Sequence, residues 1–332
     1  MRIDKKTIKK RIAKAYSAVG GPFLVPLWKD FCPNFFYLTW STINPAFLHA
    51  RGKGDVCIYT PKTNLALYAE NYGNDFEVRG YKSASEIGRA CAAGTGIDFG
   101  IPLALYKRLR VRGAHDCSQQ LLKLREKKDS GEISAMRKAR QIGMGIMESL
   151  KVKGRTEADI AREIMSRIAS EGCERAFPPI VANSRNARFP HSTPGRCMVG
   201  DYAVVDFGVG LGHYNSDVTR CLGDVSRIRG TYGALQEAAL EIADGAYAGR
   251  EVSDFVGWAG KVIRGNGLDD FPHSIGHGIG LEVHEYPVLR KKSNDVLVED
   301  SVITIEPGQY NRIGMRYEDM FVVKKRGARL LA

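Results

Sequence analysis

The spacing of apolar residues near the amino terminus predicts an amphipathic helix. Ile3, Ile8 and Ile12 recur at helical intervals, so one face of this helix can pack against the rest of the protein. The residues between them are basic and form a solvated face: Lys5, Lys6, Lys9, Lys10, Arg11 and Lys14.

Short β-prone runs alternate with turn residues in the next part of the chain. Residues 56–59 and 65–68 have the composition of strands, and residues 83–92 have that of a helix. This alternation predicts a small α/β domain in the first third of the sequence.

A helix capping signal marks the start of a second domain. Asp129 and Glu132 have the spacing of a capping box and open a helix that we expect at 131–150. We therefore place an amino-terminal domain at 1–124 and a second domain at 125–332.

The second domain continues with a mixture of helices and strands. A further helix opens at Thr156 and Asp159 and stops at Gly172. Later strands are expected at 179–182, 202–207, 214–222, 302–305 and 315–323, and helices at 235–247 and 254–264. The order strand pair, helices, strand pair predicts an α+β domain with an internal two-fold.

Composition excludes several classes of protein. Of 332 residues 44% are apolar and 26% are charged, which is typical of a globular chain. The seven cysteines are odd in number and form no C-x-x-C pair, so neither a disulfide framework nor a zinc knuckle is indicated. No apolar run reaches the roughly 18 residues of a membrane helix. We expect a soluble, cytoplasmic protein without a membrane partner.

The positive charge lies almost entirely in the first domain. The net charge is +12, and residues 1–130 contain 22 Lys and Arg against 11 Asp and Glu. Such an excess can bind nucleic acid or an acidic protein. The helical spacing of the basic residues favours a solvated helix face instead, and nucleic acid is not the partner we expect.

Two aspartates occupy the ends of apolar strands. Asp206 follows an apolar run, and Asp217 precedes another after a glycine-rich turn, so a hairpin would bring the two carboxylates side by side. Buried carboxylates need a partner, and a shared cation is one. The alternative is a partly exposed hairpin whose aspartates meet Arg220 or solvent. A nucleotide loop is excluded because the glycine spacing at 208–212 does not fit G-x-G-x-x-G.

Two glutamates repeat this situation near the carboxyl terminus. Glu306 ends the apolar run at 302–305, and Glu318 lies within the strand expected at 315–323. The two-residue period of that strand puts Arg316 on the face of Glu318, so these two residues could pair without any metal.

His277 is the remaining candidate ligand. Its neighbours Gly276 and Gly278 allow the backbone to approach another group closely. A histidine in such a loop is often only a turn residue, but four acids on strands change that reading. Oxygen-rich ligation with one imidazole suits a pair of divalent Mn, Co, Fe or Zn ions.

These motifs resemble the pita-bread metallopeptidases, a family with prolidase, aminopeptidase P, methionine aminopeptidase and the metal-free creatinases. The resemblance covers residues 120–332 and implies a C-terminal pita-bread (creatinase/aminopeptidase) fold. A weaker resemblance at 34–39 and 124–133 implies a creatinase-like N-terminal domain. The matching motifs, in the family's order, are Asp206, Asp217 in Ser-Asp-Val-Thr-Arg, His277 in Gly-His-Gly-Ile-Gly-Leu-Glu-Val-His-Glu, Glu306 in Ile-Glu-Pro-Gly and Glu318 in Arg-Tyr-Glu-Asp.

The resemblance implies a role for each of these residues. Asp206 would bind one metal, His277 and Glu306 the other, and Asp217 and Glu318 would bridge the two, which are expected to be Mn or Co. A metal-bridging hydroxide would then attack the peptide bond, with Glu306 as proton shuttle.

Four further positions match the family's catalytic and substrate-contacting residues. His284 would donate to the oxyanion, His191 is a further catalytic residue, and His273 and Arg316 contact substrate. For the three histidines the alternative is packing in the core.

One departure from the family concerns the substrate carboxylate. Many prolidases have an Arg where this chain has Val288, and Arg290 lies two residues later, on the same face of an extended segment.

We therefore expect a homodimeric Xaa-Pro dipeptidase of the prolidase branch, with Arg290 substituting for the missing Arg. Its substrates would be small peptides with proline in second position. The alternatives are an aminopeptidase P acting on longer peptides, and a pita-bread binding protein without catalysis.

Overall fold

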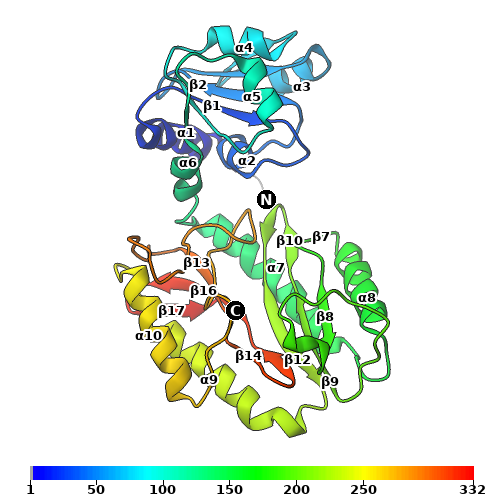
Figure 1. Cartoon of the computed structure of the whole chain (residues 1–332). Helices are drawn as coiled ribbons and strands as arrows, with labels where there is room; N and C mark the ends of the chain where they lie inside the picture. Colours follow the sequence, from blue (N-terminus) through cyan, green and yellow to red (C-terminus); the bar gives the residue numbers. More distant parts are fainter. Residues whose placement is uncertain (1–2) are drawn as a thin grey trace. The chain divides into compact units, whose positions relative to one another are not determined.

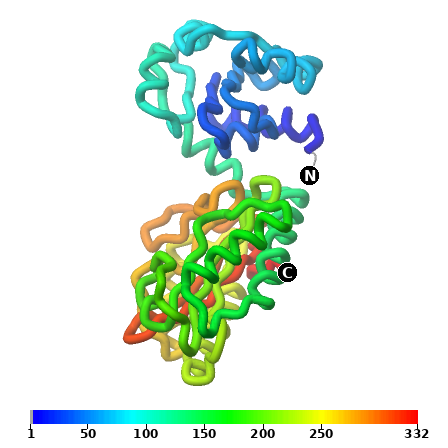
Figure 2. Tube along the Cα trace, turned by 90° about the vertical axis from the view of Figure 1, so that its right-hand side faces the viewer, coloured from blue at the N-terminus to red at the C-terminus, as the bar shows by residue number. Residues whose placement is uncertain are grey.

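The computed structural model describes residues 3–332 of the chain, which divides into two compact units, Met1–Arg125 and Glu126–Ala332. Each unit consists of one continuous stretch of chain (Figures 1 and 2). Within the described residues, no helix is both long and apolar enough to cross a membrane.

The first unit is an α/β domain around one mixed sheet, whose strand order is β4-β3-β2-β1-β5-β6. Strands β1, β2 and β3 pair antiparallel, and the outer strands add in parallel. The elements are α1 (Lys5–Val19), β1 (Phe23–Leu27), α2 (Pro33–Thr39), β2 (Ala46–Ala50), β3 (Val56–Thr60), α3 (Lys62–Tyr72), β4 (Glu77–Gly80), α4 (Ala84–Ala90), β5 (Gly96–Ile97), α5 (Leu103–Leu109), β6 (His115–Asp116) and α6 (Ser118–Leu124).

Most of the elements expected in this unit are present, and one prediction is wrong. Helix α1 buries Ile8 and Ile12 as its apolar spacing predicts, and β3 and α4 lie where a strand and a helix were expected. The strand expected at 65–68 is instead the middle of helix α3. Its apolar run is too short for periodicity to separate the two states, and the buried Tyr68, whose hydroxyl donates to the Ile43 carbonyl at 2.6 Å, ties the helix to the loop before β2.

The second unit contains four small sheets and four long helices. The two main sheets have the strand orders β12-β9-β8 and β13-β16-β17, and the other two have the orders β11-β10-β7 and β14-β15. Short strands and turns surround them. The elements are α7 (Ser130–Ser149), α8 (Glu157–Ser170), β7 (Glu174–Arg175), β8 (Ile180–Asn183), β9 (Tyr202–Phe207), β10 (Val209–Leu211), β11 (Tyr214–Asn215), β12 (Val218–Gly223), α9 (Arg229–Gly245), α10 (Val252–Gly265), β13 (Val302–Ile305), β14 (Gly308–Tyr310), β15 (Gly314–Arg316), β16 (Asp319–Lys324) and β17 (Gly327–Leu330).

The first helix of this unit begins as the sequence predicts. Asp129 accepts a hydrogen bond from the Glu132 N–H at 2.9 Å, and Glu132 accepts one from the Asp129 N–H at 2.8 Å, which is a complete capping box. Thr156 caps α8 by accepting a hydrogen bond from the Asp159 N–H at 3.1 Å.

Each pair of helices packs against one of the two main sheets, α7 and α8 against the first and α9 and α10 against the second (Figure 1). Alternate residues of β9 face opposite sides: Val205 and Phe207 pack with α7 and α8, whereas Tyr202 and Val204 pack with the core of α9 and α10. Asp206 has the second parity, so the two-residue period turns its carboxylate toward the middle of the unit.

Two of the expected strands are interrupted, and the interruptions fall at candidate ligands. The segment expected at 214–222 divides into β11 and β12 at Ser216 and Asp217, and that expected at 315–323 divides into β15 and β16 at Tyr317 and Glu318. An isolated antiparallel bridge between Thr219 and Glu318 joins the two sheets at this point.

Candidate metal centre

The paired strands β9 and β12 bring the two aspartates together. Asp206 lies opposite Thr219 in the antiparallel register. Thr219 in turn comes two residues after Asp217 in the chain. Residues 217 and 219 have the same parity, so the Asp217 carboxylate lies on the face of β12 that carries Thr219. Both aspartates are buried, at 5% and 4% exposed.

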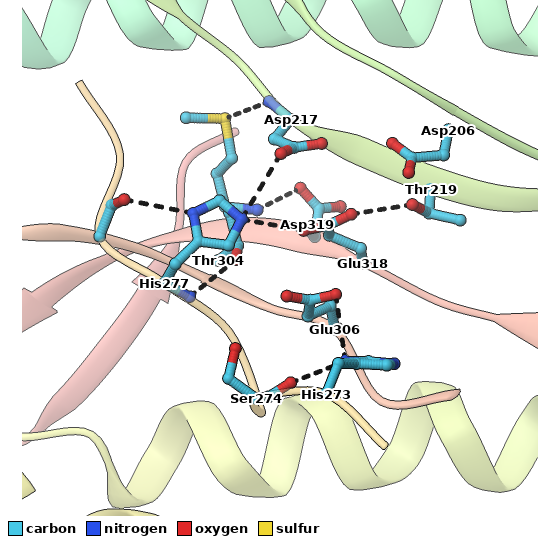
Figure 3. A network of polar contacts seen from close by, with 12 residues as sticks. Asp206, Asp217, Thr219, His273, Ser274, His277, Thr304, Glu306, Glu318 and Asp319 are labelled. Atoms are coloured by element: carbon cyan, nitrogen blue, oxygen red, sulfur yellow. Dashed lines mark hydrogen bonds and ion pairs between the residues drawn. The ribbon is translucent and has the colours of Figure 1, made fainter. Parts of the chain in front are cut away.

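The two glutamates approach the same place from the other sheet. Glu306 follows directly after β13, and Glu318 is held against β12 by the bridge to Thr219, whose hydroxyl donates to Glu318 Oε2 at 2.8 Å. Figure 3 shows Asp217 and Glu318 pointing toward one another, with Glu306 on the side of His273.

His277 completes the cluster from a tightly packed loop. A side chain at Gly278 would lie 2.3 Å from the Tyr286 carbonyl carbon, so only glycine allows this approach. The Thr304 N–H donates to the His277 carbonyl at 2.8 Å. His277 Nε2 then lies 3.6 Å from Asp217 Oδ2 and 3.8 Å from Glu318 Oε1.

A cavity of about 390 Å³ opens onto these side chains. His191, His273, His284 and Arg316 line it together with all five of the ligands expected from the sequence. The rings of His277 and His284 meet edge to face at 4.2 Å. His273 Nδ1 lies 3.5 Å from Glu306 Oε2, and its Nε2 is hydrogen-bonded to the Tyr310 hydroxyl at 2.7 Å.

The sequence suggested that Arg316 could pair with Glu318, but the structure does not contain this pair. The break in the strand at Tyr317 turns the two side chains to different partners, and the Arg316 guanidinium forms a buried ion pair with Asp206. Its other N–H groups donate at 3.3 Å to Thr219 Oγ1, the Pro190 carbonyl and the Tyr310 hydroxyl.

Arg290 lies elsewhere. It lines a second cavity, which adjoins the first at His273 and Ser274, and it is absent from the described lining of the cavity that holds the acids. Val288 is 38% exposed.

Comparison with known proteins identifies the family of the chain. The model of metallopeptidase family M24 matches residues 134–325, the region that contains every candidate ligand. The chain belongs to metallopeptidase family M24. It is accordingly a metallopeptidase, and the second unit has the pita-bread fold.

Three M24 relatives are similar over almost the whole chain. The Xaa-Pro dipeptidase of Pyrococcus horikoshii is 28% identical over 319 residues, 90% of each chain. The prolidase from Pyrococcus furiosus superimposes with a TM-score of 0.83 at 25% identity, covering 96% of this chain and 98% of that one. The X-Pro aminopeptidase from Thermotoga maritima gives 0.84 at 25% identity, covering 96% and 97%.

The side chains fit the divalent ions that an M24 peptidase uses. Asp206 Oδ1, Asp217 Oδ1 and Glu318 Oε1 are buried and have no hydrogen-bond partner among residues 3–332. Such an oxygen is costly to bury, and a divalent cation removes the cost. One ligand atom each of Asp217, His277 and Glu318 lies within 4.8 Å of the others, close enough to share an ion.

Burial and mutual proximity also shift the pKa values of the candidate ligands. Burial, followed by the neighbouring Asp206 charge, raises the pKa of Glu318 to about 7. Burial and then the Glu318 charge raise the pKa values of Asp217 and Glu306 well above their usual range. Burial lowers the pKa of His277 to about 3, so the imidazole is neutral, the form that binds metal.

Tyr310 is a residue of the M24 site that the sequence reasoning missed. Its hydroxyl joins His273 to Arg316, through contacts of 2.7 Å and 3.3 Å. The tyrosine ends the three-residue strand β14, which carries no periodic pattern long enough to be recognised.

Proposed function

We propose that the protein hydrolyses Xaa-Pro peptide bonds with two divalent ions, Mn or Co, with Fe and Zn as the other candidates. The observation that carries this proposal is the group of buried carboxylate oxygens without donors, converging with a neutral imidazole from two sheets. Relatives bearing the names Xaa-Pro dipeptidase, prolidase and X-Pro aminopeptidase support the choice of bond.

The ligands would divide between two ions. Asp206 would hold one ion, His277 and Glu306 the other, and Asp217 and Glu318 would bridge both. When bound, the ions supply a water of lowered pKa and polarise the scissile carbonyl.

The chain's own residues carry the proton transfers. Glu306 would take the proton of the attacking water and pass it to the leaving imino nitrogen. Its carboxyl group is suited to this task because it lines the cavity together with the other candidate ligands. His284, on the rim of the cavity, would donate a hydrogen bond to the developing oxyanion.

The other residues around the cavity would position the peptide. His191, His273 and Arg316 line it and would contact substrate. Tyr310 would hold His273 and Arg316 in place through its hydroxyl.

Further properties of the chain belong to the same proposal. Unit 1 would be a creatinase-like N-terminal domain and the active protein a homodimer. The seven cysteines are all free, which supports a cytoplasmic location.

Hydrolysis assays test this function directly. Protein stripped with a chelator and reloaded with Mn or Co should cleave Ala-Pro or Ala-Pro-Phe at the Xaa-Pro bond, with Ala-Ala and Ala-Ala-Phe as controls that are not cleaved. Equal cleavage of the controls would refute the proline requirement, and failure to cleave any of the four would refute the function.

Binding of polyanions by the first unit, in addition to hydrolysis, is a second candidate function. It is favoured by the charge of the first unit, which carries nearly all of the net +12. Such a surface attracts polyanions.

A further inference from the structure

A second cavity lies beside the metal centre within the second unit. Its volume is about 300 Å³, and it is formed by one side of α10 and the segments at 270–275 and 289–291. His273 and Ser274 line both cavities, so the two spaces meet at these residues.

The floor of this second cavity is apolar. Val256 and Ile263 of α10 contribute to it, with Phe271, Ile275 and Leu289 from the adjoining segments. An apolar side chain entering from the catalytic cavity would be desolvated there.

The rim of the second cavity is cationic. Arg264 is engaged by Asp270 at 3.0 Å. Arg290 and Lys291 are exposed and have no ion-pair partner in the part of the chain that the structure describes. Two cations without an ion-pair partner, next to apolar lining residues, suit a ligand that is apolar at one end and anionic at the other.

The wall between the cavities has a fixed position. His273 is held by the Tyr310 hydroxyl at 2.7 Å and by the Ser274 carbonyl at 2.8 Å, and its ring packs on Phe271 at 4.7 Å. A peptide that passes this ring leaves the catalytic cavity and enters the second one.

Arg316 is a poor receptor for a substrate carboxylate. A guanidinium has five N–H donors. Asp206, Thr219, Pro190 and Tyr310 already accept four of those of Arg316, so a bidentate grip on a carboxylate is not available.

We propose that the second cavity binds the part of the substrate that follows proline. The residue after proline would place its side chain on the apolar floor, and Arg290 and Lys291 would bind its free C-terminal carboxylate. This inference rests on the proposed function and makes the preferred substrate a tripeptide with an apolar third residue.

Kinetics with matched peptides test the inference. We compare kcat/KM for Ala-Pro-Phe with a free carboxylate, its C-terminal amide, and Ala-Pro. The wild type should cleave the free acid roughly tenfold better than the amide, because a charge-assisted contact is lost on amidation. Arg290→Gln should lower the acid-to-amide ratio toward one, mainly through KM, and Lys291→Met should lower it in part.

Lys292→Met is the matched control. Lys292 is the next exposed cation along the chain and is not among the cavity-lining residues, so this variant should retain the wild-type ratio. Equal rates on acid and amide in the wild type, or a ratio unaffected by Arg290→Gln, would overturn the second cavity as a carboxylate site while leaving Xaa-Pro hydrolysis intact. Absence of hydrolysis of all three peptides would overturn the proposed function and this inference together.

Discussion

A buried ion pair between Lys128 and Glu285 holds the segment that carries His284. Lys128 Nζ lies 2.8 Å from Glu285 Oε1, and each side chain is 1% exposed. The Glu285 N–H donates to the Gly278 carbonyl at 2.9 Å. Glu285 directly follows His284, and Gly278 directly follows His277. The ion pair therefore fixes the backbone next to both histidines.

Replacing the cation should be costly. Lys128→Met leaves the Glu285 carboxylate buried without its counter-charge, and breaking such a pair costs about 3 to 5 kcal/mol. The Glu282 N–H still donates to Glu285 Oε2 at 3.2 Å, but a neutral N–H donor does not balance a full charge. Adding Glu285→Gln removes the charge, so the double variant should be more stable than Lys128→Met alone.

The assay is urea unfolding followed by the fluorescence of Trp258. This is the single tryptophan of the second unit, and replacing Trp28 and Trp40 with Phe isolates its signal. Arg162→Met is the control, because the pair of Arg162 with Asp159 is exposed and its loss should cost less than about 1 kcal/mol.

Two results would refute this reasoning. The first is a Lys128→Met variant whose free energy of unfolding falls no further than that of Arg162→Met. The second is a double variant no more stable than Lys128→Met. Either would show that the buried pair does not determine the stability of the His284 segment.

Three further predictions concern the metal ions, the proton shuttle and acid stability. Asp217→Ala should bind fewer than the two divalent ions per chain expected of the wild type in equilibrium dialysis, and an unaltered stoichiometry would count against the site. Glu306→Gln should lose roughly 100- to 10,000-fold in kcat, whereas near-normal turnover of a folded, metal-loaded variant would exclude Glu306 as shuttle. Burial lowers the pKa of His49 to about 4 from 6.5, and both of its ring nitrogens lack a partner among residues 3–332. The unfolded chain therefore takes up this proton first, and the stability of unit 1 should fall as the pH drops from 6.5 to about 4, by up to about 3 kcal/mol. His49→Phe should flatten that part of the pH profile measured by thermal unfolding, and an unaltered profile would assign the effect to other groups.

The first unit offers a fourth test, which asks whether the protein also binds polyanions. If the basic surface serves to bind polyanions, association with DNA or RNA in filter binding should weaken strongly between two salt concentrations. Tight, salt-dependent binding would support a polyanion-binding role of the first unit beside hydrolysis, and weak binding that salt does not affect would exclude that role.

Much of the candidate site could be anticipated because its ligands lie at strand ends with clear patterns. Strands β9 and β13 have the bounds that the apolar runs predict, and the acids at the ends of these runs, Asp206 and Glu306, are both candidate ligands. The motifs around Asp217, His277 and Glu318 carry the family resemblance that the family match then supports.

The features that could not be anticipated depend on contacts between distant segments. The partner of Arg316 is Asp206, 110 residues earlier, and local strand parity pointed instead to Glu318. The interruption at Tyr317 arises where the two sheets join through Thr219 and Glu318, and a bridge across 99 residues leaves no periodic signal. Predictions from short apolar runs such as 65–68 fail for a local reason, because the pattern of such a run fits a helix and a strand equally well.

The charge of the site bears on how many ions it needs. Among the described residues that line this cavity, four are acids and one, Arg316, is a fixed cation, so the fully ionised cluster of Asp206, Asp217, Glu306 and Glu318 has three negative charges in excess. One divalent ion would still leave a negative site, which opposes the negative charge that develops on the carbonyl oxygen during attack. Two divalent ions make the site positive, which is the sign that stabilises an oxyanion in a low-dielectric cavity. The electrostatics of the chain's own residues therefore favour a two-ion centre over a one-ion centre.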